Sequence, residues 1–185
     1  MTSEEAAVAV IDALHDLAIP YILVGSFSSN YYGIGRSTKD ADFVLQLGSH
    51  SVREIADRLG PAFRLDPQMS FETVTMTTRH IVQVVSIPFR IELFDLSDDP
   101  HDQERFRRRR QGTLLDRQVM LPAVEDVIVT KLRWALGQRS KDREDVRDVI
   151  AVQGDRIDWD YVNSWCDRHG TRAVLEEIRS SIPPI

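Results

Sequence analysis

The sequence has only one cysteine, Cys166, so it can form no internal disulfide, and it has no CxxC pair of the kind that binds structural zinc. It has no apolar run of about 18 residues, the length that a membrane-spanning helix needs. Basic residues are the minority, 23 against 29 acidic ones with a net charge of −6, which argues against a general nucleic-acid-binding protein but leaves a local basic patch open. The first residues are acidic where a secretory signal peptide would be basic. We therefore expect a cytoplasmic protein without membrane association.

The composition is typical of a globular protein. Apolar residues make up 42% and charged residues 28% of the 185 positions. Apolar periodicity and turn residues predict an α/β region over residues 1–120 and a helical region over residues 121–185 that packs on it. We expect helices over 3–18 (capped by Ser3), 28–32, 51–59, 122–137, 140–154, 158–170 and 171–181, strands over 21–24 and 41–47, and β-rich stretches between 71 and 96.

Two acidic residues open the second expected strand. In an extended segment alternate side chains lie on the same face, so Asp40 and Asp42 point the same way. Neighbouring carboxylates repel each other unless a cation lies between them, and Mg²⁺ is commonly bound by one or two carboxylates together with substrate phosphates. On its own, such a pair is more often a solvated strand entrance.

The preceding strand runs into Gly25 and Ser26, directly before a short helix. A Gly-Ser turn that enters a helix offers unpaired backbone N–H groups, and glycine lets a phosphate approach closely. Taken alone, the turn would be a plain helix cap. Here the turn and the acidic pair lie on successive strands of one supersecondary unit, and together they predict a metal-bound nucleotide site.

This segment resembles the signature of the DNA polymerase β-type nucleotidyltransferase superfamily. Arg36, Thr38, Asp40 and Asp42 match the R-x-T-x-D-x-D pattern of its small bacterial members, such as the AbiE-type toxins of abortive-infection systems. Residues 122–134 are similar to a P-x-x-x-D-x-I-x-x-K-L-x-W segment of bacterial proteins with this fold. The resemblance extends over about residues 20 to 170. It implies an α/β nucleotidyltransferase fold, with a mixed β-sheet flanked by helices and a C-terminal helical bundle.

The resemblance also implies a chemistry. In the family, the turn at Gly25 and Ser26 holds a triphosphate, and the acidic pair with a third carboxylate holds two Mg²⁺ (or Mn²⁺) ions. Such an enzyme moves a nucleoside monophosphate from an NTP to an acceptor, here a protein, an RNA or a small molecule. By the same resemblance Arg36, Thr38 and Lys131 would contact the nucleotide, and the protein would belong to a toxin–antitoxin or phage-defence pair with a cognate antitoxin as partner.

The expected strand over residues 89–96 offers two candidates for the third carboxylate. Strand alternation places Asp95 on an apolar, core-directed face and Glu92 on the mixed polar face, so Glu92 is the choice. The family more often has Asp at this position. The longer side chain keeps an alternative open, in which the fold binds a nucleotide or a partner protein with little turnover.

Three further groups of charged residues lie outside the acidic pair and the turn. Lys131 lies among apolar residues, where it either contacts phosphate or acceptor or extends over the helix surface into solvent. The arginine-rich run 105–110 is expected to form a solvated helix from which one arginine at most reaches the site, because consecutive side chains cannot all face one ligand. Residues 141–148 are expected to form a mostly solvated face, with Asp145 or Asp148 turned toward the cleft.

Overall fold

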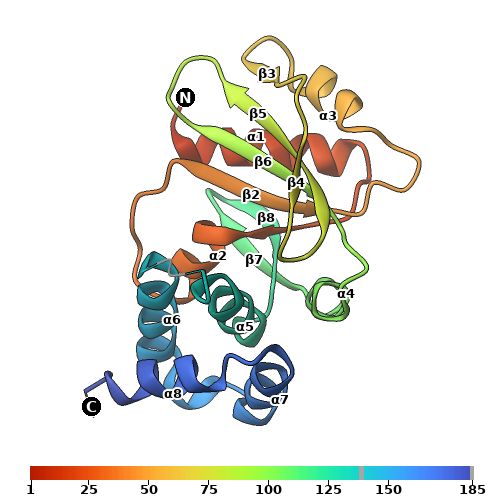
Figure 1. The fold of residues 1–185 in the computed structure, drawn as a ribbon. Helices are drawn as coiled ribbons and strands as arrows, with labels where there is room; N and C mark the ends of the chain where they lie inside the picture. Colours follow the sequence, from red (N-terminus) through yellow and green to blue (C-terminus); the bar gives the residue numbers. More distant parts are fainter. Residues whose placement is uncertain (138–139, 184–185) are drawn as a thin grey trace.

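The computed structural model describes residues 1–137 and 140–183, and its α/β part is built on one mixed sheet (Figure 1). The strands are β1 (Tyr21–Val24), β2 (Asp40–Leu45), β3 (Phe63–Leu65), β4 (Ser70–Glu72), β5 (Thr77–Val84) and β6 (Arg90–Asp95). Their order is β1-β2-β6-β5-β3, and β4 also pairs with β5. The β2–β6 pair is parallel and the other pairs are antiparallel. The predicted mixed sheet is therefore confirmed.

Helices α1 (Ser3–Asp16) and α3 (Val52–Leu59) cover one face of this sheet (Figure 1). The side chains of Thr2 and Ser51 accept hydrogen bonds from the first turns of these helices, so Thr2 caps α1 in place of the expected Ser3. Strand residues that point to these helices form the main core with them. This core includes Ala6, Ile11, Leu14, Leu23, Phe43, Leu45, Ile55, Val82, Ile91 and Leu93.

The opposite face of the sheet carries a smaller apolar cluster and the polar residues described below. Ile22, Val24 and Val44 form this cluster with Phe106 of α4 (Pro100–Arg107). A hairpin of β7 (Arg110–Leu114) and β8 (Arg117–Leu121) lies against β1. This hairpin and β3 (Phe63–Leu65) were not among the predicted elements.

The C-terminal helices build a separate core. They are α5 (Val124–Ala135), α6 (Ser140–Gln153), α7 (Trp159–His169) and α8 (Arg172–Ser180), with a 3-10 turn, Gly154–Arg156, between α6 and α7. Their buried residues include Ile128, Leu132, Val146, Val149, Val162, Cys166 and Leu175.

Helix α2 (Gly25–Tyr32) connects the two cores. Tyr32 packs on the C-terminal core, and its carbonyl oxygen accepts a hydrogen bond from Gln153 at 2.6 Å. At Gly33, a Cβ atom would lie 3.0 Å from the backbone nitrogen of Val149, so the chain after α2 approaches α6 closely. This packing holds the start of α2 in a defined place relative to α5 and α6.

Two of the predicted segments differ in the structure. The second helix begins at Gly25 instead of Ser28. Residues 73–76 form a turn although their composition favours a strand, because the Glu72 carboxylate accepts the backbone N–H groups of Val74 and Thr75.

The arginine-rich run does not form one solvated helix. It divides between α4 and β7, and Arg105 is buried in an ion pair with Asp102. Arg108 pairs with Glu125 and Asp126 at 2.9 and 3.1 Å and so ties α4 to α5. Within the described part of the chain, no helix has the length and apolar character needed to span a membrane.

Candidate functional site

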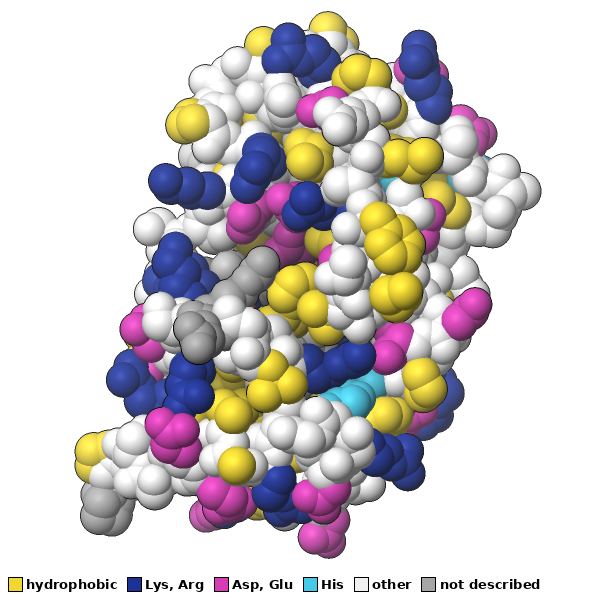
Figure 2. Space-filling view, in the orientation of Figure 1, with side chains coloured by type: hydrophobic (Ala, Val, Ile, Leu, Met, Phe, Trp, Pro, Cys, Tyr) yellow, Lys and Arg dark blue, Asp and Glu magenta, His cyan; other side chains and the backbone are white. Residues whose placement is uncertain are grey.

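Three carboxylates lie together on the sheet face that α1 and α3 leave open. Asp40 and Asp42 belong to β2, and the parallel register places Glu92 of β6 beside Asp42. Asp95 is in register with Leu45 and therefore lies on the opposite face. Figure 2 shows an acidic group over the beginning of β2, with basic side chains close by. The fold thus brings together the three residues predicted to be catalytic and keeps Asp95 apart.

The carboxylates interact electrostatically. Burial, together with the negative charges of Asp40 and Glu92, raises the pKa of Asp42 to about 7, and the positive charges of Lys131 and Arg79 oppose this rise. Near neutral pH the Asp42 carboxyl is therefore protonated in a large share of molecules. The cluster carries more negative charge than its surroundings balance.

Two arginines lie beside the carboxylates, and only Arg79 was not considered from the sequence. Arg79 donates from Nη1 to Glu92 Oε2 at 3.1 Å and from Nε to Ser70 Oγ at 2.9 Å. Arg90 Nη2 lies 3.8 Å from Asp40 Oδ2 and 3.7 Å from Glu92 Oε1. Arg79 could be recognised only from the strand register, because in sequence it resembles an ordinary exposed strand residue.

The donor chemistry of this cluster suits a divalent cation. Mg²⁺ and Mn²⁺ prefer oxygen ligands, and the repulsion that raises the pKa of Asp42 is of the kind that such an ion relieves. Within residues 1–137 and 140–183, no three His, Cys, Asp or Glu side chains already surround a common point as a finished metal site would. Asp40, Asp42 and Glu92 are the side chains that would hold the ion.

The turn between β1 and α2 lies directly against the carboxylates. Gly25 has a φ of +62°, and a Cβ atom there would lie 1.9 Å from Asp42 Oδ2, so glycine is required. The Ser28 and Ser29 hydroxyls each donate to the Gly25 carbonyl at 2.9 Å and stabilise the turn. The N-cap of α2 is Val24, which makes no side-chain cap hydrogen bond, so the first backbone N–H groups of the helix are available to an anion.

A carboxylate from the C-terminal helices holds Arg36 at this turn. Arg36 donates from Nε and Nη2 to the two oxygens of Asp145 at 2.8 and 2.9 Å, and Nη2 also donates to Ser26 Oγ at 3.2 Å. Lys131 Nζ lies 2.8 Å from both Asp142 Oδ1 and Asp145 Oδ2. Asp145 therefore joins two cations that come from different parts of the chain.

These contacts exclude one of the two alternatives for Lys131. Lys131 is only 9% exposed, so it does not extend into solvent. Burial lowers its pKa, but Asp142 and Asp145 more than compensate and keep the amine charged. Asp142 is itself buried, which corrects the expectation of a solvated position there. Of the two candidates expected to turn inward, Asp145 is the buried one, whereas Asp148 pairs with Arg147. The role of Asp142 was missed because its partner Lys131 lies on another helix.

Thr38 supports the acidic pair. Its hydroxyl donates to Asp40 Oδ1 at 2.9 Å, which orients that carboxylate. Upstream, the Asn30 side chain donates to the Arg36 carbonyl at 2.7 Å and accepts from the Arg36 backbone N–H at 3.2 Å. The loop that carries Arg36 and Thr38 is thus held to α2.

No family model matches the chain, and no curated protein sequence matches it. Solved structures share its architecture. The solution structure of the antibiotic-resistance factor ANT(2″)-Ia has 14% sequence identity and a TM-score of 0.65, with 96% of each chain covered. A crystal structure of ANT(2″)-Ia in complex with adenylyl-2″-tobramycin has 13% identity and a TM-score of 0.65 over 94% of this chain and 99% of that chain.

A third neighbour is a nucleotidyltransferase-like protein from Paracoccidioides brasiliensis, with 16% identity and a TM-score of 0.56 over 99% of this chain and 94% of that one. The chain has the nucleotidyltransferase fold. In this nucleotidyltransferase fold, the turn at Gly25 follows β1, directly beside Asp42 of β2, and Glu92 of the neighbouring strand β6 lies next to Asp42. Helices α5 and α6 contribute Lys131 and Asp145, and Asp145 contacts Arg36 beside this turn.

Proposed function

We propose that this protein is a nucleotidyltransferase that uses Mg²⁺ or Mn²⁺ to move a nucleoside monophosphate from an NTP to a hydroxyl group of an acceptor. The observation that carries the proposal is the close approach of the Gly25 turn to Asp42, with Glu92 in register beside it. An anion-binding helix start and a carboxylate cluster then share one space, as transfer from a metal-bound triphosphate requires. The neighbour solved with adenylyl-2″-tobramycin, a nucleotidylated antibiotic, adds support.

In this proposal the residues have distinct tasks. The backbone N–H groups at Gly25 and Ser26 bind the triphosphate, and Arg36 and Lys131 supply positive charge near it. Thr38 orients Asp40. The α/β region, residues 1–120, and the helical region, residues 121–185, act as one unit because Asp145 reaches across to Arg36.

Asp40, Asp42 and Glu92 would hold the ion, which would lower the pKa of the acceptor hydroxyl and neutralise charge on the phosphates. The acceptor oxygen forms a bond to the α-phosphorus, and the bond from that phosphorus to pyrophosphate breaks in line. Glu92 receives the proton of the acceptor hydroxyl, since it is the third carboxylate and lies beside Asp42.

The resemblance of residues 36–42 to the pattern of abortive-infection toxins supports a role of this reaction in phage defence. We place the protein in the cytoplasm, in a toxin–antitoxin or phage-defence pair with a cognate antitoxin as partner. The acceptor in such a system is a macromolecule or metabolite of the cell.

A binding and transfer experiment tests the proposed function. NTP with Mg²⁺ or Mn²⁺ should raise the melting temperature by mass action on the folded state, and the variant carrying Asp40→Asn and Asp42→Asn should lose this gain. Labelled NTP incubated with cell extract should pass label to an acceptor with the wild type only. Nucleotide binding without transfer to any component would show that the protein is a nucleotide-binding module.

A further inference from the structure

The sheet face beyond the carboxylates is basic. Arg90 of β6 is in register with Gln83 of β5, and Gln83 is in register with Arg64 of β3. Arg79 lies four residues before Gln83 on β5 and so points to the same face. Alternation from Arg90 places Glu92 on this face as well. We call Arg64, Arg79 and Arg90 the arginine strip.

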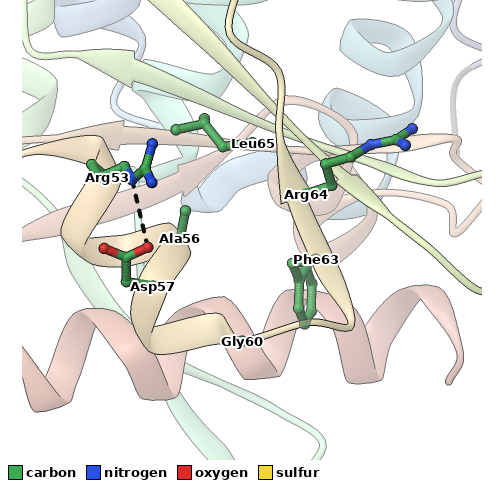
Figure 3. A pocket seen from close by; sticks show the side chains of 7 residues that line it. All are labelled: Arg53, Ala56, Asp57, Gly60, Phe63, Arg64 and Leu65. Atoms are coloured by element: carbon green, nitrogen blue, oxygen red, sulfur yellow. Dashed lines mark ion pairs between the residues drawn. The ribbon is translucent and has the colours of Figure 1, made fainter.

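The arginine strip is accessible and partly organised. The Arg79 and Arg90 side chains are 36% and 51% exposed, and Arg64 is exposed. Arg64 Nη2 donates to Gln83 Oε1 at 2.5 Å, and Arg79 is held by Ser70 and Glu92. Figure 3 shows that the Arg64 guanidinium extends away from the pocket between α3 and β3, whereas Arg53 lies on the other side of that pocket.

The strip lies on the acceptor side of the carboxylates. The strand order is β1-β2-β6-β5-β3, so the Gly25 turn follows the strand at one edge, and the strip occupies β6, β5 and β3 toward the other. In an in-line transfer the acceptor and the leaving pyrophosphate lie on opposite sides of the reacting phosphorus. A triphosphate at the Gly25 turn therefore places the acceptor toward the arginines.

We propose that the acceptor carries a phosphate group near its reactive hydroxyl and that the arginine strip binds this phosphate. The inference rests on the proposed function, because the direction of the acceptor follows from the position of the NTP. A guanidinium group presents a planar fork of donors that matches phosphate oxygens. Arg79 and Arg90 face Glu92 and Asp40, whereas Arg64 donates to the neutral amide of Gln83, so Arg64 keeps a positive charge on this face that can attract an anion.

A purely structural role for the arginines makes a different prediction. Arg79 and Arg90 could serve only to balance the charges of Glu92 and Asp40. Arg64 separates the two explanations, because its hydrogen bond goes to the neutral amide of Gln83. If the arginines only balance the carboxylates, replacing Arg64 should leave ligand binding unchanged. If they form a phosphate site, replacing Arg64 should weaken binding.

The test measures binding without NTP. The probe is a short fluorescent oligoribonucleotide with a free 3′-hydroxyl, followed by fluorescence anisotropy over a range of salt concentrations. Arg64→Gln and Arg79→Gln should each weaken binding by about fivefold or more and reduce the slope of log K against log salt by about one. Arg156→Gln, at an exposed arginine of the 3-10 turn, is the matched control and should bind as the wild type does.

Competition distinguishes the two sources of phosphate. Displacement of the probe by a nucleoside 5′-monophosphate supports a small phosphorylated acceptor, and failure of the monophosphate to compete supports an RNA end. Equal binding by the Arg64→Gln and Arg156→Gln variants would overturn the proposal, as would preferential binding of a polyamine such as tobramycin. If the arginine variants lose binding but the wild type transfers no label, the proposed function fails while the phosphate site stands.

Discussion

The Asp42 carboxylate lies so close to the backbone of Gly25 that a Cβ atom on Gly25 would sit 1.9 Å from Asp42 Oδ2. The two residues belong to neighbouring antiparallel segments, because Val24 is in register with Asp42. A phosphate bound at the turn would therefore lie next to an ion bound at the carboxylates. This contact makes position 25 sensitive to substitution.

Gly25→Ala should damage both the fold and the site. The methyl group would displace Asp42, and the φ of +62° strains any residue with a side chain, so we expect a loss of about 2–4 kcal/mol in the free energy of unfolding. Gly35→Ala is the control, since a Cβ atom there meets no atom within 4 Å, and it should change stability by less than about 0.5 kcal/mol. Urea denaturation of both variants measures the difference, and equal stabilities would contradict the packing described here.

Asp42→Asn should stabilise the protein in metal-free buffer at alkaline pH. The pKa of Asp42 is raised from 3.8 to about 7, so the folded state holds the proton more tightly, and the contribution of Asp42 to stability falls as pH rises from about 4 to about 7. Asn does not titrate. We expect the variant to melt higher than wild type at pH 8, with a gain of up to about 4 kcal/mol in the free energy of unfolding, and the gain to shrink toward pH 5.

Melting curves in the presence of a chelator at several pH values measure this effect. Divalent cation and NTP should reverse the order of the two proteins, because only the wild type has the full carboxylate cluster. A difference in melting temperature that does not change with pH would show that the charge of Asp42 is not destabilising.

Glu92→Gln separates catalysis from binding. The substitution keeps size and hydrogen bonding but removes a negative charge and a proton acceptor, so turnover should fall by about 10² or more while nucleotide affinity changes little. Asp95→Asn should be mild by comparison, because its side chain lies on the other face of β6. Single-turnover transfer assays compare the two, and a greater loss with Asp95→Asn would assign the third carboxylate to the wrong residue.

Asp145→Asn should loosen the contact between the helical region and the turn at Gly25 and Ser26. Asp145 is 5% exposed and accepts hydrogen bonds from both Arg36 and Lys131, whose positive charges hold its pKa below the usual value despite burial. Removing this charge leaves Lys131 with Asp142 alone and should cost about 2–4 kcal/mol in the free energy of unfolding. Nucleotide affinity should fall as well, because Arg36 loses the carboxylate that holds its guanidinium beside Ser26.

Asp148→Asn is the matched control on the same helix. Its carboxylate pairs with the neighbouring Arg147, whose side chain is 49% exposed, so the change should stay within about 0.5 kcal/mol. Chemical denaturation and nucleotide titration of both variants give the two readouts. Similar results for Asp145→Asn and Asp148→Asn would show that the buried network does not position Arg36.

The local pattern was sufficient to predict much of the fold. Apolar periodicity and end signals predict the helices and strands near their observed bounds, since these patterns reflect which face of each segment is buried. One error occurs where a side chain competes with the backbone, at residues 73–76, where the Glu72 carboxylate stabilises a turn in a segment of strand-forming residues. The short strand β3 and the β7–β8 hairpin were not among the predicted elements.

The sequence by itself determined which chemistry the site contains. Asp40 and Asp42 share a strand face and Gly25 precedes a helix because these are relationships between near neighbours in the chain. Only the tertiary structure decided that Glu92 lies beside Asp42, that Asp145 joins Arg36 to Lys131, and that three arginines share one face. Each of these contacts depends on strand register or helix packing between segments far apart in the chain. Their charges interact strongly only where folding brings them within a few ångströms and away from solvent.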